Sequence, residues 1–151
     1  MAAGFSISTV KIKKFSKGIN KIAQEELTEE ILSRRLKIDA EVHFNQLNQE
    51  LFDKIRRFEP AGLGNPTPVF VTRGVNIVSA RAVGRDGAHL KLKLEESGIS
   101  FSAIAFNKAA YYTKLPPDRK IDIAFSFEEN TFNGYINLEL KVRDLRTNEG
   151  N

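Results

Sequence analysis

The sequence predicts an α+β chain in which one or two amphipathic helices precede a barrel of five β-strands. Three observations carry this prediction. Apolar residues recur at helical spacing up to residue 58, the pattern changes to alternating apolar and polar residues from Val69 onward, and a stretch rich in proline and glycine, FEPAGLGNPTPVF (58–70), lies between them. With 151 residues and 41% hydrophobic residues, the chain can form one core, or one domain with an appendage.

The first 37 residues are expected to be the helical segment. From Val10 to Leu36, apolar side chains mostly follow one another at steps of three to five residues, with Lys and Glu between them, which indicates one amphipathic helix or two consecutive ones. Gly18 weakens the pattern, and Thr28 can restart it as an N-cap. Residues 4–7 are expected to end a strand. Residues 1–37 contain 8 Lys or Arg and 4 Asp or Glu, whereas residues 38–151 contain 15 basic and 15 acidic residues. The net charge of +4 therefore arises in residues 1–37.

A second helix is expected before the proline-rich stretch. Residues 38–42 alternate as a short strand would, and Asn45 can then cap a helix with an apolar stripe that ends at Pro60. The stripe consists of Phe44, Leu47, Leu51, Ile55 and Phe58. In the stretch 58–70, the prolines restrict the residues before them, and the glycines take conformations closed to other residues. We expect a structural corner there.

Five strands are expected after this corner. They lie at 70–83, 89–94, 99–106, 121–128 and 135–142, with a short helix at 107–114 between the third and the fourth. Gly74 is a plausible bulge that bends the long first strand, and Asp86-Gly87 and Asn133-Gly134 are tight turns. This order is the connectivity of an OB-fold barrel. Another small α+β domain is the alternative.

Several spaced motifs point to one family. In order, they are Ile38-Asp39-Ala40-Glu41, Phe58-Glu59-Pro60, Gly62, Gly64-Asn65-Pro66, Pro68-Val69-Phe70, Val83-Gly84-Arg85-Asp86-Gly87, His89-Leu90-Lys91-Leu92, Asn130, Asn133-Gly134 and Asp144-Leu145-Arg146. Over residues 38–146, the chain resembles the C-terminal part of the RecJ family of bacterial single-stranded-DNA-specific exonucleases. Ala61 departs from the pattern, because the family more often has an aromatic residue there.

The resemblance also implies a domain organisation. Residues 1–5 are similar to the segment that follows a Gly-Gly-His motif at the end of the family's second catalytic-core domain. We therefore expect residues 1–37 to be the tail of that domain with a connecting helix, 38–146 to be the OB domain, and 147–151 to be a disordered tail. The domain with the metal-binding aspartate-histidine cluster would lie upstream of this sequence.

Little in the sequence suggests catalysis by the chain alone. It has no cysteine, its two histidines are His43 and His89, and no aspartate-histidine spacing or glycine-rich phosphate loop occurs. We expect no catalytic residue, no metal site and no cofactor in this chain. No apolar run approaches the roughly 18 residues of a membrane span, and no signal peptide is recognisable, so we predict a cytoplasmic protein without a membrane partner.

Binding is the more promising function. OB-folds commonly hold single strands against their second and third strands, flanked by two loops. The predicted nucleic-acid-binding residues on this basis are Arg81, Arg85, His89, Lys91, Lys93 and Phe132. In the alternative interpretation, the lysines only solvate an exposed face and Phe132 closes the end of the barrel. A second basic cluster, Lys108, Lys114, Arg119 and Lys120, has no fixed relation to this groove.

The resemblance implies that the intact enzyme degrades single strands from 5′ to 3′ with Mg²⁺ or Mn²⁺, in recombination and repair. This chain would grip single-stranded DNA, with the missing catalytic core and single-stranded-DNA-binding protein as further partners. The alternative is a protein-interaction module that docks the exonuclease core or single-stranded-DNA-binding protein. A third hypothesis is a free-standing nuclease, but the sequence lacks the metal ligands that such an enzyme needs.

Overall fold

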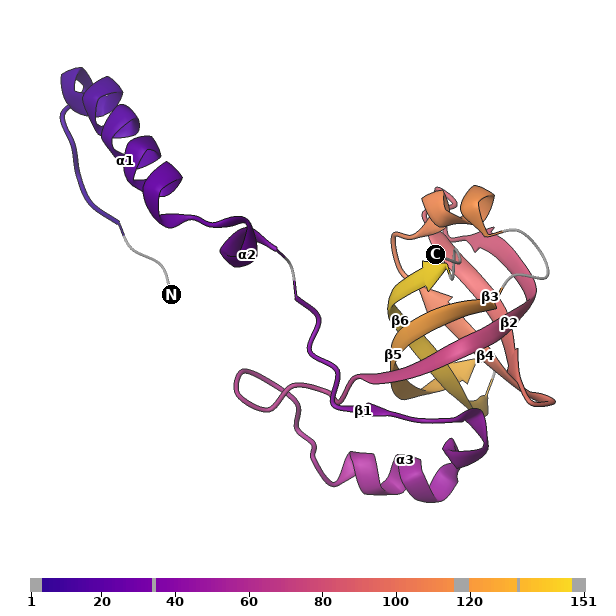
Figure 1. Ribbon diagram of the computed structural model, residues 1–151. Coiled ribbons are helices and arrows are strands. Elements are labelled where there is room, and N and C mark those ends of the chain that lie inside the picture. The colour runs from indigo at the N-terminus through magenta and orange to yellow at the C-terminus, as the bar shows by residue number, and fades with distance from the viewer. Residues whose placement is uncertain (1–3, 34, 116–119, 133, 148–151) are drawn as a thin grey trace. The chain divides into compact units, whose positions relative to one another are not determined.

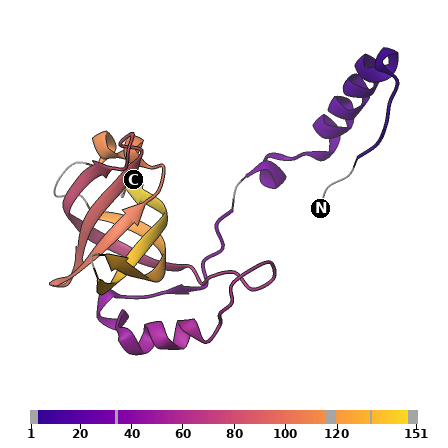
Figure 2. The same cartoon turned by 180° about the vertical axis from the view of Figure 1, so that it is seen from behind.

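The computed structural model describes residues 4–33, 35–115, 120–132 and 134–147. The chain divides into two compact units, Met1–Leu36 and Lys37–Asn151, and each is described by itself. Figures 1 and 2 show the helical first unit and the barrel of the second. A helix followed by a closed five-stranded OB barrel confirms the predicted fold class. None of the described helices is both long enough and apolar enough to span a membrane.

The first unit contains two helices, α1 (Ile12–Glu26) and α2 (Glu29–Leu32), after a 3-10 turn at Thr9–Lys11. The hydroxyl of Thr28 accepts a hydrogen bond from the Ile31 N–H (3.3 Å), so α2 begins at the predicted cap. The strand expected at residues 4–7 is wrong: the described part of the segment is not a strand and pairs with none. Instead, the ring of Phe5 packs against that of Phe15, with centroids 4.8 Å apart.

An exposed apolar stripe runs along α1. Its members are Ile12, Phe15, Ile19 and Ile22, and none of the described residues of α1 is buried. The stripe follows the predicted helical spacing, so its register on the helix is as expected. Phe5 covers part of Phe15, and all four members of the stripe remain between 39% and 54% exposed.

The second unit begins with β1 (Ala40–Glu41), a 3-10 turn η2 (Phe44–Gln46) and α3 (Gln49–Arg56). The expectation that Asn45 caps the helix is wrong. Asn48 is the cap, and its Oδ1 accepts from the Leu51 N–H (2.9 Å). The helix begins later than predicted because residues 44–46 form the tighter turn, which buries Phe44.

Aromatic packing closes one end of the barrel. The ring of Phe52 on α3 meets Phe127 edge-on at 5.9 Å between centroids, and Phe44 meets Phe101 at 5.3 Å. In Figures 1 and 2, α3 lies across this end. Phe58, expected in the apolar stripe, is 62% exposed because the helix ends at Arg56, before the stripe reaches it.

The barrel consists of β2 (Phe70–Val83), β3 (His89–Glu96), β4 (Ile99–Ala105), β5 (Lys120–Phe132) and β6 (Tyr135–Thr147). Strand order is β1-β2-β3-β4-β6-β5, and a β2–β5 pairing closes the sheet. β4 and β6 run parallel, and the other barrel pairs are antiparallel. The core includes Val75, Leu90, Leu92, Leu94, Ile121, Ile123, Phe125 and Leu140. The expected short helix is a 3-10 helix, η3 (Ala109–Lys114), followed by the buried Leu115.

Gly74 bends β2, as predicted. It has a φ of +66°, and the register of β2 on β5 shifts between Thr72 and Val75. The Gly74 N–H donates to the Asp122 carboxylate (3.0 Å), and the guanidinium of Arg73 lies 3.6 Å from the other oxygen of that carboxylate. The bulge is therefore held from β5, and it lets β2 pair with both β3 and β5.

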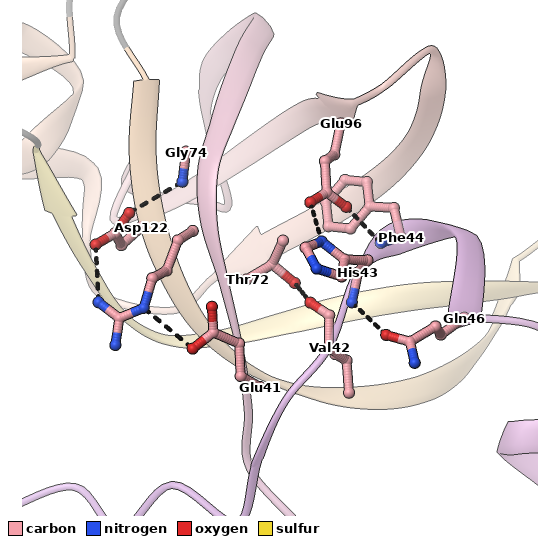
Figure 3. Close-up of polar contacts among 10 residues, drawn as sticks. Glu41, Val42, His43, Phe44, Gln46, Thr72, Gly74, Glu96 and Asp122 are labelled. Carbon is pink, nitrogen blue, oxygen red and sulfur yellow. Dashed lines mark hydrogen bonds and ion pairs between the residues drawn. The ribbon is translucent and has the colours of Figure 1, made fainter.

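Polar contacts attach the segment before α3 to the barrel (Figure 3). Glu96, at the end of β3, accepts from the Phe44 N–H (2.5 Å) and lies 2.7 Å from Nδ1 of His43. The buried hydroxyl of Thr72 donates to the carbonyl of Val42 (2.7 Å). β1 also pairs in parallel with the start of β2. The segment that leads into α3 is thus part of the barrel's framework.

The corner at 58–70 connects α3 to β2. The side-chain amide of Asn65 donates to the carbonyls of Phe58 (2.6 Å) and Pro60 (3.2 Å), and Gly62 and Asn65 exchange backbone hydrogen bonds. Gly64 takes a φ of +89°, which favours glycine. Between this corner, α3 and β5 is a cavity of about 360 Å³, and Ala61 is among the residues that line it.

Candidate nucleic-acid interface

The strict alternation of β3 separates two faces. Leu90, Leu92 and Leu94 are buried in the barrel. The residues between them, together with His89, therefore point outward, so the structure places His89, Lys91 and Lys93 on one outer face. The half-exposed His89 and Lys91 and the exposed Lys93 follow one another along the strand.

Cross-strand register brings further residues to this face. Arg81 on β2 pairs with Lys91, which pairs with Ile104 on β4, and Ile104 pairs with Lys141 on β6. Directly paired residues point to the same face, so Arg81, Lys91 and Lys141 lie in one row. With neighbouring strands about 4.8 Å apart, this row crosses roughly 14 Å of the sheet.

Lys91 has a carboxylate partner. Its ammonium forms an ion pair with Glu139 on β6, which is only 6% exposed. The other oxygen of Glu139 accepts a hydrogen bond from the amide of Asn130 (2.8 Å). A buried carboxylate requires such partners, because its charge has lost its water. The positive charge of Lys91 therefore mainly balances the negative charge of Glu139.

A second ion pair lies beside the first. The ammonium of Lys141 is 3.2 Å from Oε2 of Glu128, and Arg143 is 3.9 Å from the other oxygen of that carboxylate. The hydroxyl of Ser126 also donates to Glu128 (2.9 Å). The middle of the face is therefore a set of paired charges.

On this face, the cations without an acidic partner among the described residues lie on the β2–β3 side. They are Arg81, Arg85 and Lys93, all exposed, and we refer to them as the cationic edge. Arg85 lies in the turn between the two strands, where Gly84 and Gly87 have φ values of +96° and +61°. The structure thus brings Arg81, Lys91 and Lys93 onto one face, with Arg85 at its end.

Two aromatic positions flank this face. Phe132 ends β5 in register with Tyr135, and its side chain lies outside the described residues, so its predicted stacking role stays a prediction. Tyr135 is 75% exposed on the same hairpin. Because β4 and β6 are parallel, this hairpin is at the amino end of β4. Phe106 follows the carboxyl end of β4, beside the β2–β3 turn.

Several residues of the face were missed from the sequence: Phe106, Glu128, Glu139, Lys141 and Arg143. Alternation in the last strand already placed Glu139 and Lys141 opposite to Leu138 and Leu140, and so outside the barrel. Their proximity to Lys91 depends on the register of β6 on β4, which local alternation does not determine.

The second predicted basic cluster is only partly described. The ammonium of Lys108 lies 2.9 Å from the Asp144 carboxylate and 5.1 Å from the ring centroid of Tyr111. Lys120 is exposed at the start of β5, whereas Arg119 and the side chain of Lys114 lie outside the described residues. Among the described residues, no three His, Asp or Glu side chains gather in a group suited to a metal ion.

A closed five-stranded barrel of this connectivity, with an outer face that carries cations across β2 and β3, defines an OB-fold domain. The family model described as the RecJ OB domain matches residues 38–144. The chain belongs to this family, which confirms the resemblance.

Individual relatives agree. The single-stranded-DNA-specific exonuclease RecJ of Haemophilus influenzae is 35% identical over 147 residues, which cover 94% of this chain and 25% of that protein. The enzyme of the same name from Salmonella typhimurium is 27% identical, over 96% of this chain and 25% of its own length. A crystal structure of Thermus thermophilus RecJ in complex with Mn²⁺ matches 97% of this chain and 21% of its own, with a TM-score of 0.77 and 25% identity. The chain thus spans a quarter or less of these relatives.

Proposed function

We propose that this chain is the single-stranded-DNA-gripping part of a RecJ-like 5′-to-3′ exonuclease that acts in DNA repair and recombination. Its relatives are named as single-stranded-DNA-specific exonucleases, and it matches the OB portion of that family. The observation that carries the proposal is the cationic edge: Arg81, Arg85 and Lys93 are exposed and have no acidic partner among the described residues.

The grip works on the DNA backbone. Phosphates carry the charge of a single strand, and cations that neutralise them release condensed counterions. We assign this role to the cationic edge rather than to Lys91, because Lys91 is already paired with Glu139. Phosphate contacts hold a strand without reading its sequence, so the binding tolerates any base order.

Catalysis belongs to other parts of the enzyme in this proposal. The Mg²⁺ or Mn²⁺ that supports hydrolysis would be bound by the catalytic core, of which this chain would be the neighbour in a longer protein. Such an enzyme works where the chromosome is, so the proposal includes a cytoplasmic location.

Fluorescence anisotropy with a short labelled oligonucleotide tests the grip. The variant Arg81→Ala/Arg85→Ala/Lys93→Ala is expected to bind at least tenfold more weakly than the parent chain at low salt. The slope of log affinity against log salt should fall by about 2, because each lost contact to a single strand removes roughly 0.7. The matched control, Lys37→Ala/Lys54→Ala/Arg57→Ala, removes as many exposed positive charges away from this face and should bind like the parent.

Two results would contradict the proposal. One is an affinity that does not change with salt. The other is equal weakening by the two triple variants, because net charge rather than the cationic edge would then explain the binding.

A second candidate function, docking of a protein partner, is favoured by the exposed apolar stripe of α1. The partners would be the catalytic core or single-stranded-DNA-binding protein. Retention of either purified partner by the immobilised chain, lost in Phe15→Glu/Ile22→Glu and kept in the cationic-edge variant, would support it. Loss in the cationic-edge variant alone would instead indicate a bridging nucleic acid.

A further inference from the structure

We infer that Phe106, flanked by His89 and Lys141, is a stacking platform for one base of the bound strand. The inference rests on the proposed function and deepens it, because it names a binding subsite and the group that occupies it. No feature of the sequence marked Phe106 for this role.

The position of Phe106 suits such a platform. It directly follows Ala105, which is buried and pairs with Leu90 on β3, so Phe106 lies at the outer face where β4 ends. Its side chain is 48% exposed. An aromatic ring that is half covered by the protein and half open to solvent has room for a partner.

The surroundings of Phe106 hold the ring in place. The imidazole of His89 meets it at an interplanar angle of 69°, with centroids 5.0 Å apart. The ammonium of Lys141 lies 5.7 Å from the ring centroid, a cation–π distance. These neighbours come from β3 and β6, the two strands on either side of β4. A ring fixed in this way loses little conformational freedom when a base stacks on it.

His89 is itself fixed. Its Nδ1 accepts a hydrogen bond from the backbone N–H of Asn107 (3.2 Å). Gly84, with a φ of +96°, lies so close that a Cβ there would be 3.1 Å from Cδ2 of the imidazole. Lys108, which follows Asn107 in the turn after β4, forms an ion pair with Asp144, with 2.9 Å between its ammonium and the carboxylate. The β2–β3 turn and the turn after β4 therefore support the platform from both sides.

Charge complementarity favours a nucleotide over a purely apolar ligand. The base would lie on Phe106, and the phosphates beside it would approach the cationic edge, since Arg81 pairs with Lys91 next to Ile104 on β4. Every base has a π-face, so stacking here adds affinity without sequence preference. This agrees with a nuclease domain that must accept any strand.

Tryptophan fluorescence offers a direct test, because the chain contains no tryptophan. In Phe106→Trp, saturation with unlabelled oligothymidylate should quench the emission, with the same midpoint as in anisotropy. The control Phe58→Trp places the probe just after α3, at the opposite end of the barrel, where the native phenylalanine is 62% exposed, and its emission should not respond. Phe106→Ala should bind labelled oligothymidylate about 5- to 150-fold more weakly, with an unchanged salt slope. Phe58→Ala should bind like the parent.

A strand of abasic sugar phosphates separates stacking from charge. It should bind the parent chain and Phe106→Ala equally, because no base remains to stack. If the parent binds oligothymidylate while Phe106→Ala binds equally well and Phe106→Trp is not quenched, the platform is wrong and the proposed function stands. If the parent chain binds no oligonucleotide at low salt, the proposed function fails and the platform with it. Thermal unfolding of Phe106→Ala confirms that a loss of binding is not a loss of fold.

Discussion

Lys91 illustrates how a cation on the candidate face can stabilise the fold rather than bind a ligand. Its ion pair with the nearly buried Glu139 stabilises a charge that could not otherwise remain inside the structure. Removal of the lysine leaves that carboxylate, among the described residues, with the amide of Asn130 alone. A weakened DNA affinity in a Lys91 variant would therefore not by itself identify a phosphate contact.

Lys91→Met is expected to destabilise the barrel by about 2–4 kcal/mol, because it breaks a buried pair and leaves an uncompensated charge. Urea unfolding followed by circular dichroism measures this. Lys93→Met, on the same face but exposed and without an acidic partner among the described residues, should stay within about 0.5 kcal/mol of the parent. The double variant Lys91→Met/Glu139→Gln should recover part of the loss. If Lys91→Met has the same free energy of unfolding as the parent, Glu139 needs no counter-charge.

His43 makes the attachment of the pre-α3 segment sensitive to pH. Its hydrogen bond to Glu96, and then the negative charge of that carboxylate, raise the pKa of His43 above the ordinary value of 6.5. A folded-state pKa above the unfolded one means that protonation favours the folded chain. This stabilisation is complete below about pH 6.5 and is lost as the pH rises through the folded-state pKa.

His43→Gln should therefore lower the melting temperature most at about pH 6 and progressively less towards pH 9. Thermal unfolding of both chains across this range measures the difference. In a Glu96→Gln background, the same substitution should have a much smaller effect that varies little with pH. A difference that grows with rising pH would contradict the sign of the argument.

At the scale of elements, α3 begins where a side chain satisfies its first free N–H groups. Asn48 does so by accepting from Leu51, and Asn45, three residues earlier, lies in the preceding 3-10 turn. Asparagine is favoured as a cap, and we expected Asn45 to be the one used. The choice between them depends on the burial of Phe44 against Phe101, a contact between residues far apart in the sequence.

Asn48→Ala is expected to cost about 1 kcal/mol of unfolding free energy, because it removes the cap. Asn45→Ala, a substitution of the same chemistry, should cost only a few tenths. Urea denaturation of the two variants under one set of conditions compares them. Equal costs would show that the capping bond contributes nothing measurable.

For the molecule as a whole, periodicity predicted the five strands, and their order together with the family resemblance indicated an OB-fold barrel. The long first strand matches residues 70–83, and the bulge at Gly74 follows from a glycine within a strand pattern. The candidate face was predicted only in part. Alternation placed Lys91 and Lys93 outward. However, Glu139, the partner of Lys91, lies on β6 and is bound in turn by Asn130 on β5. The proposed role of Phe106 likewise depends on its neighbours His89 on β3 and Lys141 on β6. Such neighbourhoods arise from barrel closure, which no local pattern encodes.

The parallel pairing of β4 with β6 also constrains the order in which this unit can assemble. β6 is the last strand of the chain that the structure describes, and it fills the space between β4 and β5. Until residues 135–147 have been synthesised, both of those strands have a free edge whose unpaired backbone groups can form hydrogen bonds with other chains. During synthesis the edge of β4 is free from about residue 105 and that of β5 from about residue 132, and the pairing of β6 covers both.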